Sequence, residues 1–318
     1  MTTAANSTNV HIDSAADLAG LIPYLLGYEP ESDSVVLVGL RHNLVRCALR
    51  VRVDDGEIQD SDVEHYVVIL RHNGCDRLAI IGYGAAGALL DKLRQRCEHD
   101  TVPMRVIVTA QVRDGYLYPR WPDPDRSAES VPTASPAVCA MIAAGGSGPK
   151  NRRDLARLFK PAERRECDKV ARALEEQRRR QADDDTTDPE SRGKDLLCLD
   201  YWRQQTRLPE AAEIAEIALA LSDVEVRDWL LDCMGDDPGQ NNVDLWIWAA
   251  RHLRGTPCAT VACVAAFAAY RCGNGVVAAE AVDCALRANP RYRLAALLWE
   301  ALQRGIPPHR LGRRTLPD

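Results

Sequence analysis

The sequence predicts an α/β N-terminal domain with a mixed sheet covered by helices, followed by an all-α C-terminal domain. Short β-branched runs alternate with helical apolar spacing over about residues 10–120, and the pattern is helical from about residue 134 onward. The length of 318 residues and the hydrophobic content of 46% suffice for two domains. We therefore expect an α/β domain over 10–148, a connecting segment over 149–194 and a helical, repeat-like domain over 195–318.

The first predicted element is a helix over residues 15–26. Its apolar residues recur at the spacing of one helix face, and they are Leu18, Leu21, Ile22, Leu25 and Leu26. Ser14 and Asp17 fit a capping box at its start, and Gly27 fits its end. Pro23 falls inside the pattern, so we expect a kink or a short first segment there.

Strands and helices alternate after this first helix. Residues 34–40 and 44–53 are β-branched runs separated by Arg-His-Asn, which predicts a hairpin. The spacing then predicts a helix at about 60–72, a strand at 77–83, a helix at 85–98 and a strand at 104–112. Asp114 and Gly115 mark a second tight turn. Because helices separate the strands, a mixed sheet with helical cover is expected.

The connecting region is predicted from its composition. Five prolines fall within residues 119–136, where no periodicity is visible and a loop is expected. A capped helix is expected to start at Asn151, and a polar helix is expected over 161–180. The acidic stretch 183–193 is expected to be a disordered linker because it has almost no apolar residues. About six helices should follow, up to residue 305.

A glycine pattern at the end of the predicted strand 77–83 is a candidate cofactor site. Gly82, Gly84 and Gly87 match G-x-G-x-x-G directly after a strand and at the opening of a helix, as in a dinucleotide fingerprint. The acid expected near the end of the next strand is absent, so the alternative is a small-residue turn that lets the helix pack on the sheet. Asp33 and Ser34 could complete a pocket with this turn, although acids that flank strands are usually turn formers.

The segment 150–180 is a candidate site for an anionic partner. It holds 12 Lys and Arg against six Asp and Glu, a charge of +6 in a chain whose net charge is −6, so the rest carries −12. A basic helix that ends in Arg178, Arg179 and Arg180 suits nucleic acid, an anionic membrane surface or an acidic partner. The alternative is a solvated helix whose charges pair at i, i+4, as Arg172 with Glu176.

No catalytic or metal-binding constellation is evident in the sequence. The 11 cysteines include no C-x-x-C pair, and the nearest cluster (His252, Cys258, Cys263 and Cys272) does not place its members on one helix face. We expect free thiols, no metal, no cofactor and no catalytic residues, and we favour a protein that is not an enzyme while leaving that question open. No signal peptide is evident and no apolar run approaches 18 residues, so a cytoplasmic protein without a membrane span is expected.

The C-terminal helices carry a repeat-like pattern over residues 258–290. Small residues stand at Ala266, Ala278 and Ala285, a Gly-Asn-Gly turn lies at 273–275, and Pro290 closes the unit. This arrangement resembles one tetratricopeptide repeat, in which small residues let paired helices pack closely. The usual early Trp is replaced by Ala262.

Both ends of the chain resemble a known family. DLAGLIPYLLGYEPESDSVVLVGL near the start and FAAYRCGNGVVAAEAVDCALRANPRYRLAALLWEALQRGIPP near the end are similar to the actinobacterial domain-of-unknown-function 4192 family. Family members often carry a cysteine-containing C-C-P-x-x-G-like stretch after the tyrosine strand, where this chain has WPDPDRSAES. The resemblance implies a bacterial cytosolic protein of two-part architecture, and it implies no established activity.

The favoured hypothesis is a protein–protein interaction or scaffold module that binds an unknown partner through its C-terminal helices. One alternative is a nucleotide- or anion-binding enzyme or sensor that uses the turn at 82–87. A second alternative is a nucleic-acid-associated factor that uses the basic helix within 150–180.

Overall fold

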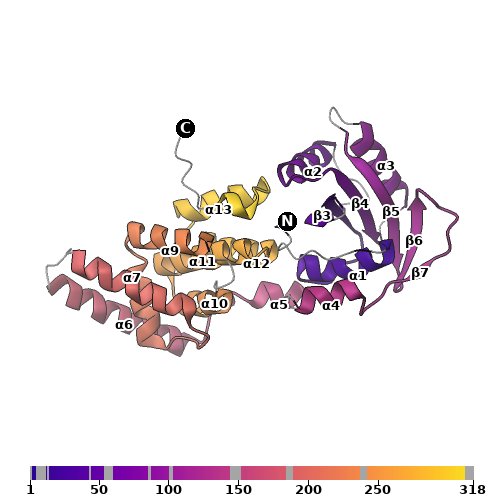
Figure 1. The fold of residues 1–318 in the computed structure, drawn as a ribbon. Helices are drawn as coiled ribbons and strands as arrows, with labels where there is room; N and C mark the ends of the chain where they lie inside the picture. The colour runs from indigo at the N-terminus through magenta and orange to yellow at the C-terminus, as the bar shows by residue number, and fades with distance from the viewer. Residues whose placement is uncertain are drawn as a thin grey trace, which may run out of the picture. The chain divides into compact units, whose positions relative to one another are not determined.

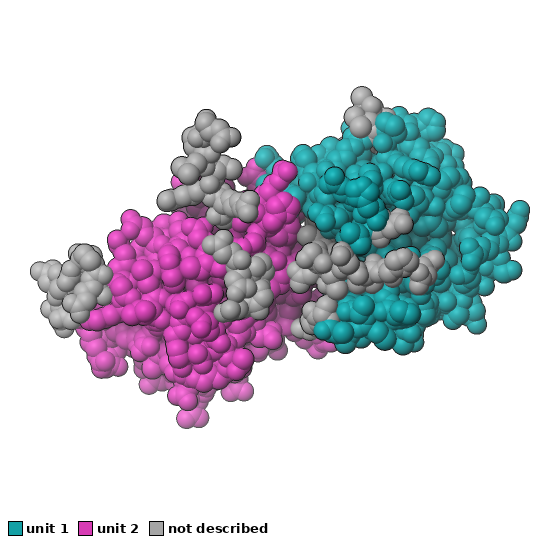
Figure 2. Space-filling view, viewed as in Figure 1, with its two compact units in different colours: residues 1–152, 303–307 teal, residues 153–302, 308–318 magenta. Residues whose placement is uncertain are grey.

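The computed structural model describes residues 2–4, 12, 14–42, 44–53, 60–84, 87–99, 103–143, 152–183, 189–236 and 242–311. The chain forms two compact units, coloured separately in Figure 2. Unit 1 comprises residues 1–152 together with 303–307, and unit 2 comprises 153–302 together with 308–318. The chain therefore returns to unit 1 after unit 2 has been built.

Unit 1 is built on a mixed sheet of seven strands in the order β1-β3-β2-β4-β5-β6-β7 (Figure 1). The strands are β1 Thr2–Ala4, β2 Ser34–Arg41, β3 Leu44–Arg52, β4 Arg77–Tyr83, β5 Arg105–Arg113, β6 Tyr116–Trp121 and β7 Glu129–Ser130. β4 and β5 are parallel, and the other neighbouring pairs are antiparallel. The predicted mixed sheet and its two hairpins are confirmed, whereas the two edge strands β1 and β7 were not predicted.

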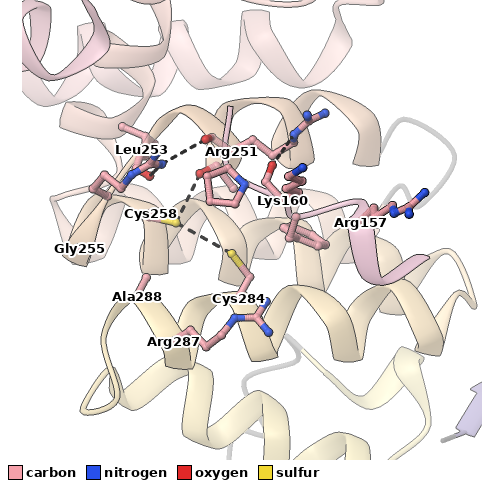
Figure 3. A pocket seen from close by; sticks show the side chains of 13 residues that line it. Arg157, Lys160, Arg251, Leu253, Gly255, Cys258, Cys284, Arg287 and Ala288 are labelled. Carbon is pink, nitrogen blue, oxygen red and sulfur yellow. Dashed lines mark hydrogen bonds between the residues drawn. The ribbon is translucent and has the colours of Figure 1, made fainter. Parts of the chain in front are cut away.

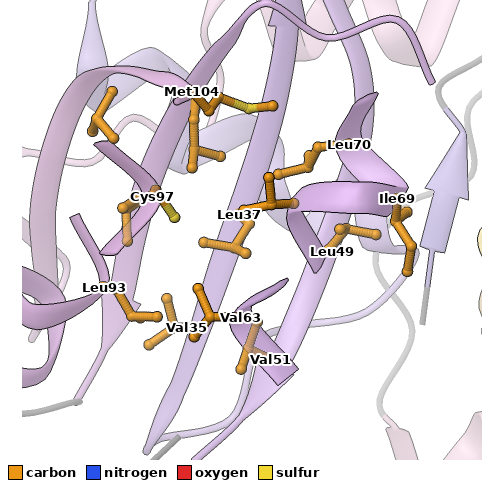
Figure 4. Packing of buried hydrophobic residues seen from close by; sticks show 14 of the residues in the cluster. Val35, Leu37, Leu49, Val51, Val63, Ile69, Leu70, Leu93, Cys97 and Met104 are labelled. Atoms are coloured by element: carbon orange, nitrogen blue, oxygen red, sulfur yellow. The ribbon is translucent and has the colours of Figure 1, made fainter. Parts of the chain in front are cut away.

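Helices cover both faces of this sheet. The helices of unit 1 are α1 Ala15–Leu26, α2 Asp60–His72, α3 Gly87–His99 and α4 Pro136–Ala143. α2 and α3 pack their apolar faces on β2, β3 and β4, where Leu37, Leu49, Leu70 and Leu93 belong to one buried cluster (Figure 4). α1 contacts β3, β5 and β6 on the opposite face. β2 is buried from Ser34 to Leu40, which explains its continuous apolar run.

The predicted start and end of α1 are confirmed. The Asp17 backbone N–H donates to Ser14 Oγ at 3.0 Å, and Gly27 ends the helix with a left-handed φ of 78°. The helix runs through Pro23 without ending. Proline at this position leaves the Ala19 carbonyl without its helical donor, and the half-buried Tyr83 hydroxyl donates to that carbonyl at 3.3 Å.

The structure differs from the predicted loop over 119–136. β6 continues through Pro119, and β7 adds a short strand at 129–130. Only Tyr116 and Leu117 of β6 pair with β7, so the strand has one unpaired edge at Pro119, where a residue without a backbone N–H is tolerated.

The segment 303–307 belongs to unit 1 because it binds α2. Asn73 Nδ2 donates to the Gly305 carbonyl at 3.0 Å and to the Ile69 carbonyl at 2.9 Å. Gly305 has a φ of 56° and lies so close to Ile69 that a Cβ atom could not be accommodated without movement. The hydrogen bond between Asn73 and Gly305, which are 232 positions apart in the sequence, thus joins this segment to the rest of unit 1.

Unit 2 is helical, as predicted. Its helices are α5 Arg152–Arg157, α6 Arg164–Asp183, α7 Pro189–Gln204, α8 Ala211–Ala220, α9 Val224–Asp236, α10 Val243–His252, α11 Gly255–Arg271, α12 Gly275–Ala288 and α13 Arg293–Gln303, followed by a 3-10 turn at Pro308–Arg310. α11 is buried from Cys258 to Tyr270 and packs against α8, α9, α10 and α12. A helix that is apolar all round belongs at the centre of a bundle.

The connecting segment departs from its expected form. α6 buries Cys167, Val170 and Leu174 and packs on α8, so it is a part of unit 2. Of the stretch 183–193, which we expected to be disordered, Asp183 lies in α6 and residues 189–193 lie in α7. Residues 184–188 and the expected cap Asn151 lie outside the described residues. Within the described part of the chain, no helix is long and apolar enough to cross a membrane.

We predict that Leu37→Ala lowers the free energy of unfolding by about 2–5 kcal/mol, because it leaves a cavity between β2 and the helices. Leu37 is 0% exposed, whereas Val68 on α2 is 45% exposed. Val68→Ala is therefore the control and should change stability by less than about 0.5 kcal/mol. Urea unfolding followed by circular dichroism measures both variants, and equal losses would contradict this packing.

Candidate functional site

The glycine turn lies in the predicted strand–turn–helix context, between β4 and α3, with residues 85–86 outside the described residues. A Cβ atom at Gly82 would lie 2.9 Å from the Leu90 side chain, so the glycine allows α3 to pack on the sheet. Gly84 has a left-handed φ of 65°. A Cβ atom at Gly87 would overlap the guanidinium of Arg120. Gly82 and Gly84 thus have a local structural cause, as the small-residue-turn alternative requires, whereas the Arg120 guanidinium at Gly87 is the end of a flexible side chain that can move.

Asp33 and Ser34 do lie beside this turn. The Asp33 backbone N–H donates to the Tyr83 carbonyl at 2.7 Å, and Ser34 forms a bridge with Gly84. Asp33 has a φ of 64°, a conformation that Asp adopts more readily than most residues, and the buried Ser34 hydroxyl donates to the Glu31 carbonyl at 2.7 Å. The pair therefore closes a turn, with the Ser34 hydroxyl already engaged.

Arg120, a cation beside this turn, is already paired with a carboxylate. Arg120 on β6 reaches the start of α3, and its Nη2 lies 2.6 Å from Asp91 Oδ2. Both side chains are about one-third exposed, at 33% and 39%. An anion at the start of α3 would have to compete with the Asp91 carboxylate for this guanidinium.

The basic helix α6 carries its charges as surface pairs. Arg179 Nε lies 3.2 Å from Glu175, and Arg180 pairs with Glu176, both at i, i+4 spacing. The expected pair of Arg172 with Glu176 is wrong, because Arg172 donates to the Asp168 carbonyl instead. Arg178 is exposed on the same helix. Arg180 also lines a cavity of about 340 Å³ whose other members include Lys194, Asp195 and Glu216.

The four residues of the sequence that came nearest to a metal-binding cluster, His252, Cys258, Cys263 and Cys272, do not form a set of metal ligands. All eleven cysteines are free thiols, and His252 bonds through Nδ1 to the Trp248 carbonyl. Burial raises the pKa of Cys263 to about 12, because a thiolate inside α11 would lack solvation. Among the described residues, no group of three or more His, Cys, Asp or Glu is placed to hold a metal ion.

The most developed site is a basic pocket of about 640 Å³ in unit 2 (Figure 3). Five cations from three segments of the chain line it, and they are Arg157 and Lys160, Arg251 and Arg254, and Arg287. Its other lining residues are apolar or neutral, and they are Phe159, Pro161, Ala250, Leu253, Gly255, Cys258, Cys284 and Ala288. Among the residues that the structure describes, none with a carboxylate belongs to the lining. We refer to this site as the basic pocket.

Backbone and arginine side-chain hydrogen bonds hold the lining segments of the basic pocket together. The Ala162 N–H donates to the Arg251 carbonyl at 2.9 Å, and Arg251 Nε donates to the Lys160 carbonyl at 2.9 Å. Arg254 Nη1 donates to the Leu253 carbonyl at 2.9 Å, and its Nη2 donates to Cys167 Sγ at 2.9 Å. The segment between α5 and α6 is therefore held against the end of α10.

The electrostatics of the basic pocket favour an anion. Arg254 occupies the N-cap position of α11 without a side-chain capping bond, and the first turn of this 17-residue helix lines the pocket through Gly255 and Cys258. The positive end of the helix dipole adds to the side-chain cations there. Acidic partners reach two of the cations from outside the lining, since Arg287 pairs with Asp283 at 3.0 Å and Arg157 with Asp154 at 3.8 Å.

Sequence reasoning missed the basic pocket because its cations carry no linear signal. They are spread over residues 157–287, and only the ends of α5, α10 and α11 bring them together with α12. The basic segment 150–180 includes two members of the set, Arg157 and Lys160, but the run of consecutive arginines in this segment is Arg178–Arg180.

Comparisons with known proteins give one match. A family model described as Domain of unknown function (DUF4192) matches residues 16–309, nearly the whole chain. The searches of curated proteins and of solved structures found no match.

We predict that Gly84→Ala destabilises unit 1 more than Gly115→Ala. Both glycines have positive φ, 65° and 76°, and alanine in this region costs about 1–2 kcal/mol. Only Gly84 is also crowded, since its Cβ would lie 3.2 Å from the Asp33 backbone nitrogen, whereas nothing lies within 4 Å of a Cβ at Gly115. Thermal unfolding should show the lower Tm for Gly84→Ala, and equal Tm values would argue against close packing of the turn on Asp33.

Proposed function

This chain belongs to the DUF4192 family, whose description assigns no activity, and we propose that it is an interaction protein that binds an acidic segment of a protein partner in the basic pocket. The observation that carries the proposal is the convergence of five cations, with no carboxylate among the described residues of the lining. It extends the hypothesis of a scaffold module acting through the C-terminal helices, and it involves no catalytic step.

The charge of the basic pocket supports an anionic occupant. Like charges brought together around one cavity repel each other, and a bound carboxylate relieves that repulsion. Four of the five cations are arginines, whose planar guanidinium groups can bind a carboxylate through two parallel hydrogen bonds.

The apolar part of the basic pocket supports a peptide-like occupant. Phe159 and Leu253 are buried side chains, 5% and 3% exposed, and they lie in the lining between the cations. An acidic segment that carries one apolar side chain would use both kinds of surface. The size fits this occupant, because specific binding sites for small groups are typically hollows of about 300–1,000 Å³.

The two alternative functions have weaker support. Gly82 and Gly84 of the glycine turn have a structural cause, and Arg120, a cation beside the turn, is paired with Asp91. Arg179 and Arg180 of the basic helix are paired with glutamates on the same helix. We expect the interaction to take place in the cytoplasm, since eleven free cysteines suit a reducing compartment.

We predict that the double variant Lys160→Glu/Arg287→Glu weakens binding of an acidic peptide at least about tenfold, because reversed charges in the basic pocket repel carboxylates. A fluorescein-labelled peptide of glutamates around a single leucine is the probe, and fluorescence anisotropy gives its Kd. Binding to the unaltered chain should also weaken as salt is added.

The matched control is Arg178→Glu/Arg179→Glu, which makes the same change in net charge on the exposed end of α6. It should leave peptide affinity within about twofold, because surface charges far from a contact contribute little. If both double variants lost the same affinity for the peptide, the net charge of the chain would explain the loss, and the proposal would be contradicted. Tight binding of a single-stranded oligonucleotide that only the control variant abolishes would favour the nucleic-acid alternative instead.

A further inference from the structure

Two thiols face each other in the lining of the basic pocket. Cys258 lies on α11 and Cys284 on α12, and their Sγ atoms are 4.0 Å apart (Figure 3). The two residues are 6% and 8% exposed, and both belong to the lining. A small solute that enters the basic pocket can therefore reach the sulfur atoms.

The surroundings of the two thiols differ. The contact with Cys258, together with the Arg287 guanidinium, holds the pKa of Cys284 below the ordinary range of a thiol, although burial and Asp283 act against this. The same hydrogen bond and burial raise the pKa of Cys258, with Arg254 and Arg287 opposing. Cys284 is thus the member that becomes a thiolate, and Cys258 is the one that stays protonated.

A second pair of cysteines lies at a similar distance in different surroundings. Cys47 and Cys75 of unit 1 have Sγ atoms 3.8 Å apart inside the main apolar cluster. Cys47 is 0% exposed, and its hydrogen bond with Cys75 and its burial raise its pKa well above the ordinary value. The distance between sulfur atoms is therefore not what distinguishes Cys258 and Cys284. Cys258 and Cys284 differ from that pair because they line a pocket whose lining also holds several cations.

We propose that Cys258 and Cys284 form an oxidisable dithiol, which a hydroperoxide that enters the basic pocket converts to a disulfide. The inference is independent of the proposed binding of an acidic segment, because it depends only on the two sulfur atoms and their access to solvent.

The chemistry proceeds in two steps. The Cys284 thiolate attacks the terminal peroxide oxygen, the O–O bond breaks, and the other oxygen leaves as an alcohol after taking a proton from solvent. Cys284 is now a sulfenic acid. Cys258 attacks this sulfur, the S–O bond breaks, and the hydroxide leaves as water with the proton of the Cys258 thiol. Two thiols and one hydroperoxide give one disulfide, one alcohol and one water.

Formation of the bond requires a limited movement. The two sulfur atoms must close from 4.0 Å to about 2.0 Å. Cys258 Sγ donates to the Ala250 carbonyl at 3.3 Å, and this hydrogen bond is lost when the thiol reacts. The reaction therefore breaks the hydrogen bond between Cys258 of α11 and Ala250 of α10, and it adds a covalent link between α11 and α12.

The test uses the full chain treated with hydrogen peroxide, blocked with N-ethylmaleimide at intervals and digested with trypsin. Cleavage after Arg254, Arg271 and Arg287 gives the peptides 255–271 and 272–287, each of which holds two cysteines. We expect these peptides to become joined, and fragmentation should place the bond between Cys258 and Cys284. The internal control is the pair of peptides 47–50 and 72–77, which carry Cys47 and Cys75. They should join at least about tenfold more slowly.

Three variants sharpen the assignment. Cys263→Ala/Cys272→Ala removes the other two cysteines of these peptides and should leave the cross-link intact. Cys284→Ser should abolish reaction at position 258. Cys258→Ser should stop the reaction at the sulfenic acid, which dimedone then labels on Cys284.

Three results would overturn the proposal. The first is that peroxide leaves peptides 255–271 and 272–287 separate in the unaltered chain. The second is that Cys47 and Cys75 join as fast as Cys258 and Cys284. The third is that dimedone labels Cys258 rather than Cys284. Circular dichroism of each variant establishes that the chain is folded, and the unaltered chain decides the first two results without any substitution.

Discussion

The burial of β2 on both faces is the constraint on which the arrangement of unit 1 depends. A strand without a solvent face needs apolar cover from both sides, and α1 supplies it on one face while α2 and α3 supply it on the other. The cover on the α1 side includes a proline, and the sheet compensates for it through the Tyr83 hydroxyl. The same packing brings the start of β2 beside the end of β4, so Asp33 meets Gly84 as a consequence of the core.

Much of unit 1 follows from local sequence. Ser14 and Gly27 delimit α1 because their side-chain chemistry and backbone freedom act within a few residues. Asp114 and Gly115 adopt φ values of 50° and 76°, so the turn that their sequence predicts is the one that joins β5 to β6. The two edge strands β1 and β7 have only three and two residues and take their conformation from the neighbouring strand, so no local pattern predicts them.

Long-range packing decides what the sequence did not predict. Three buried residues at the spacing of one face, Cys167, Val170 and Leu174, fix α6 on α8, yet the many charges around them resemble a solvated linker. The basic pocket is formed where helices end, so its cations lie close together in the fold although they come from distant parts of the sequence. Buried α11 is the common support of this site, because its first turn holds Cys258 and its length positions α10 and α12 around it.

The return of residues 303–307 to unit 1 has a consequence for the order in which the protein is made. A ribosome releases the N-terminal part of a chain first, and domains generally fold as they emerge. Asn73 must wait for Gly305, so the sheet and its helices can assemble early but one face of α2 lacks its last partner until nearly all of unit 2 has been translated. A nascent chain of this protein therefore spends most of its synthesis with that surface of α2 uncovered.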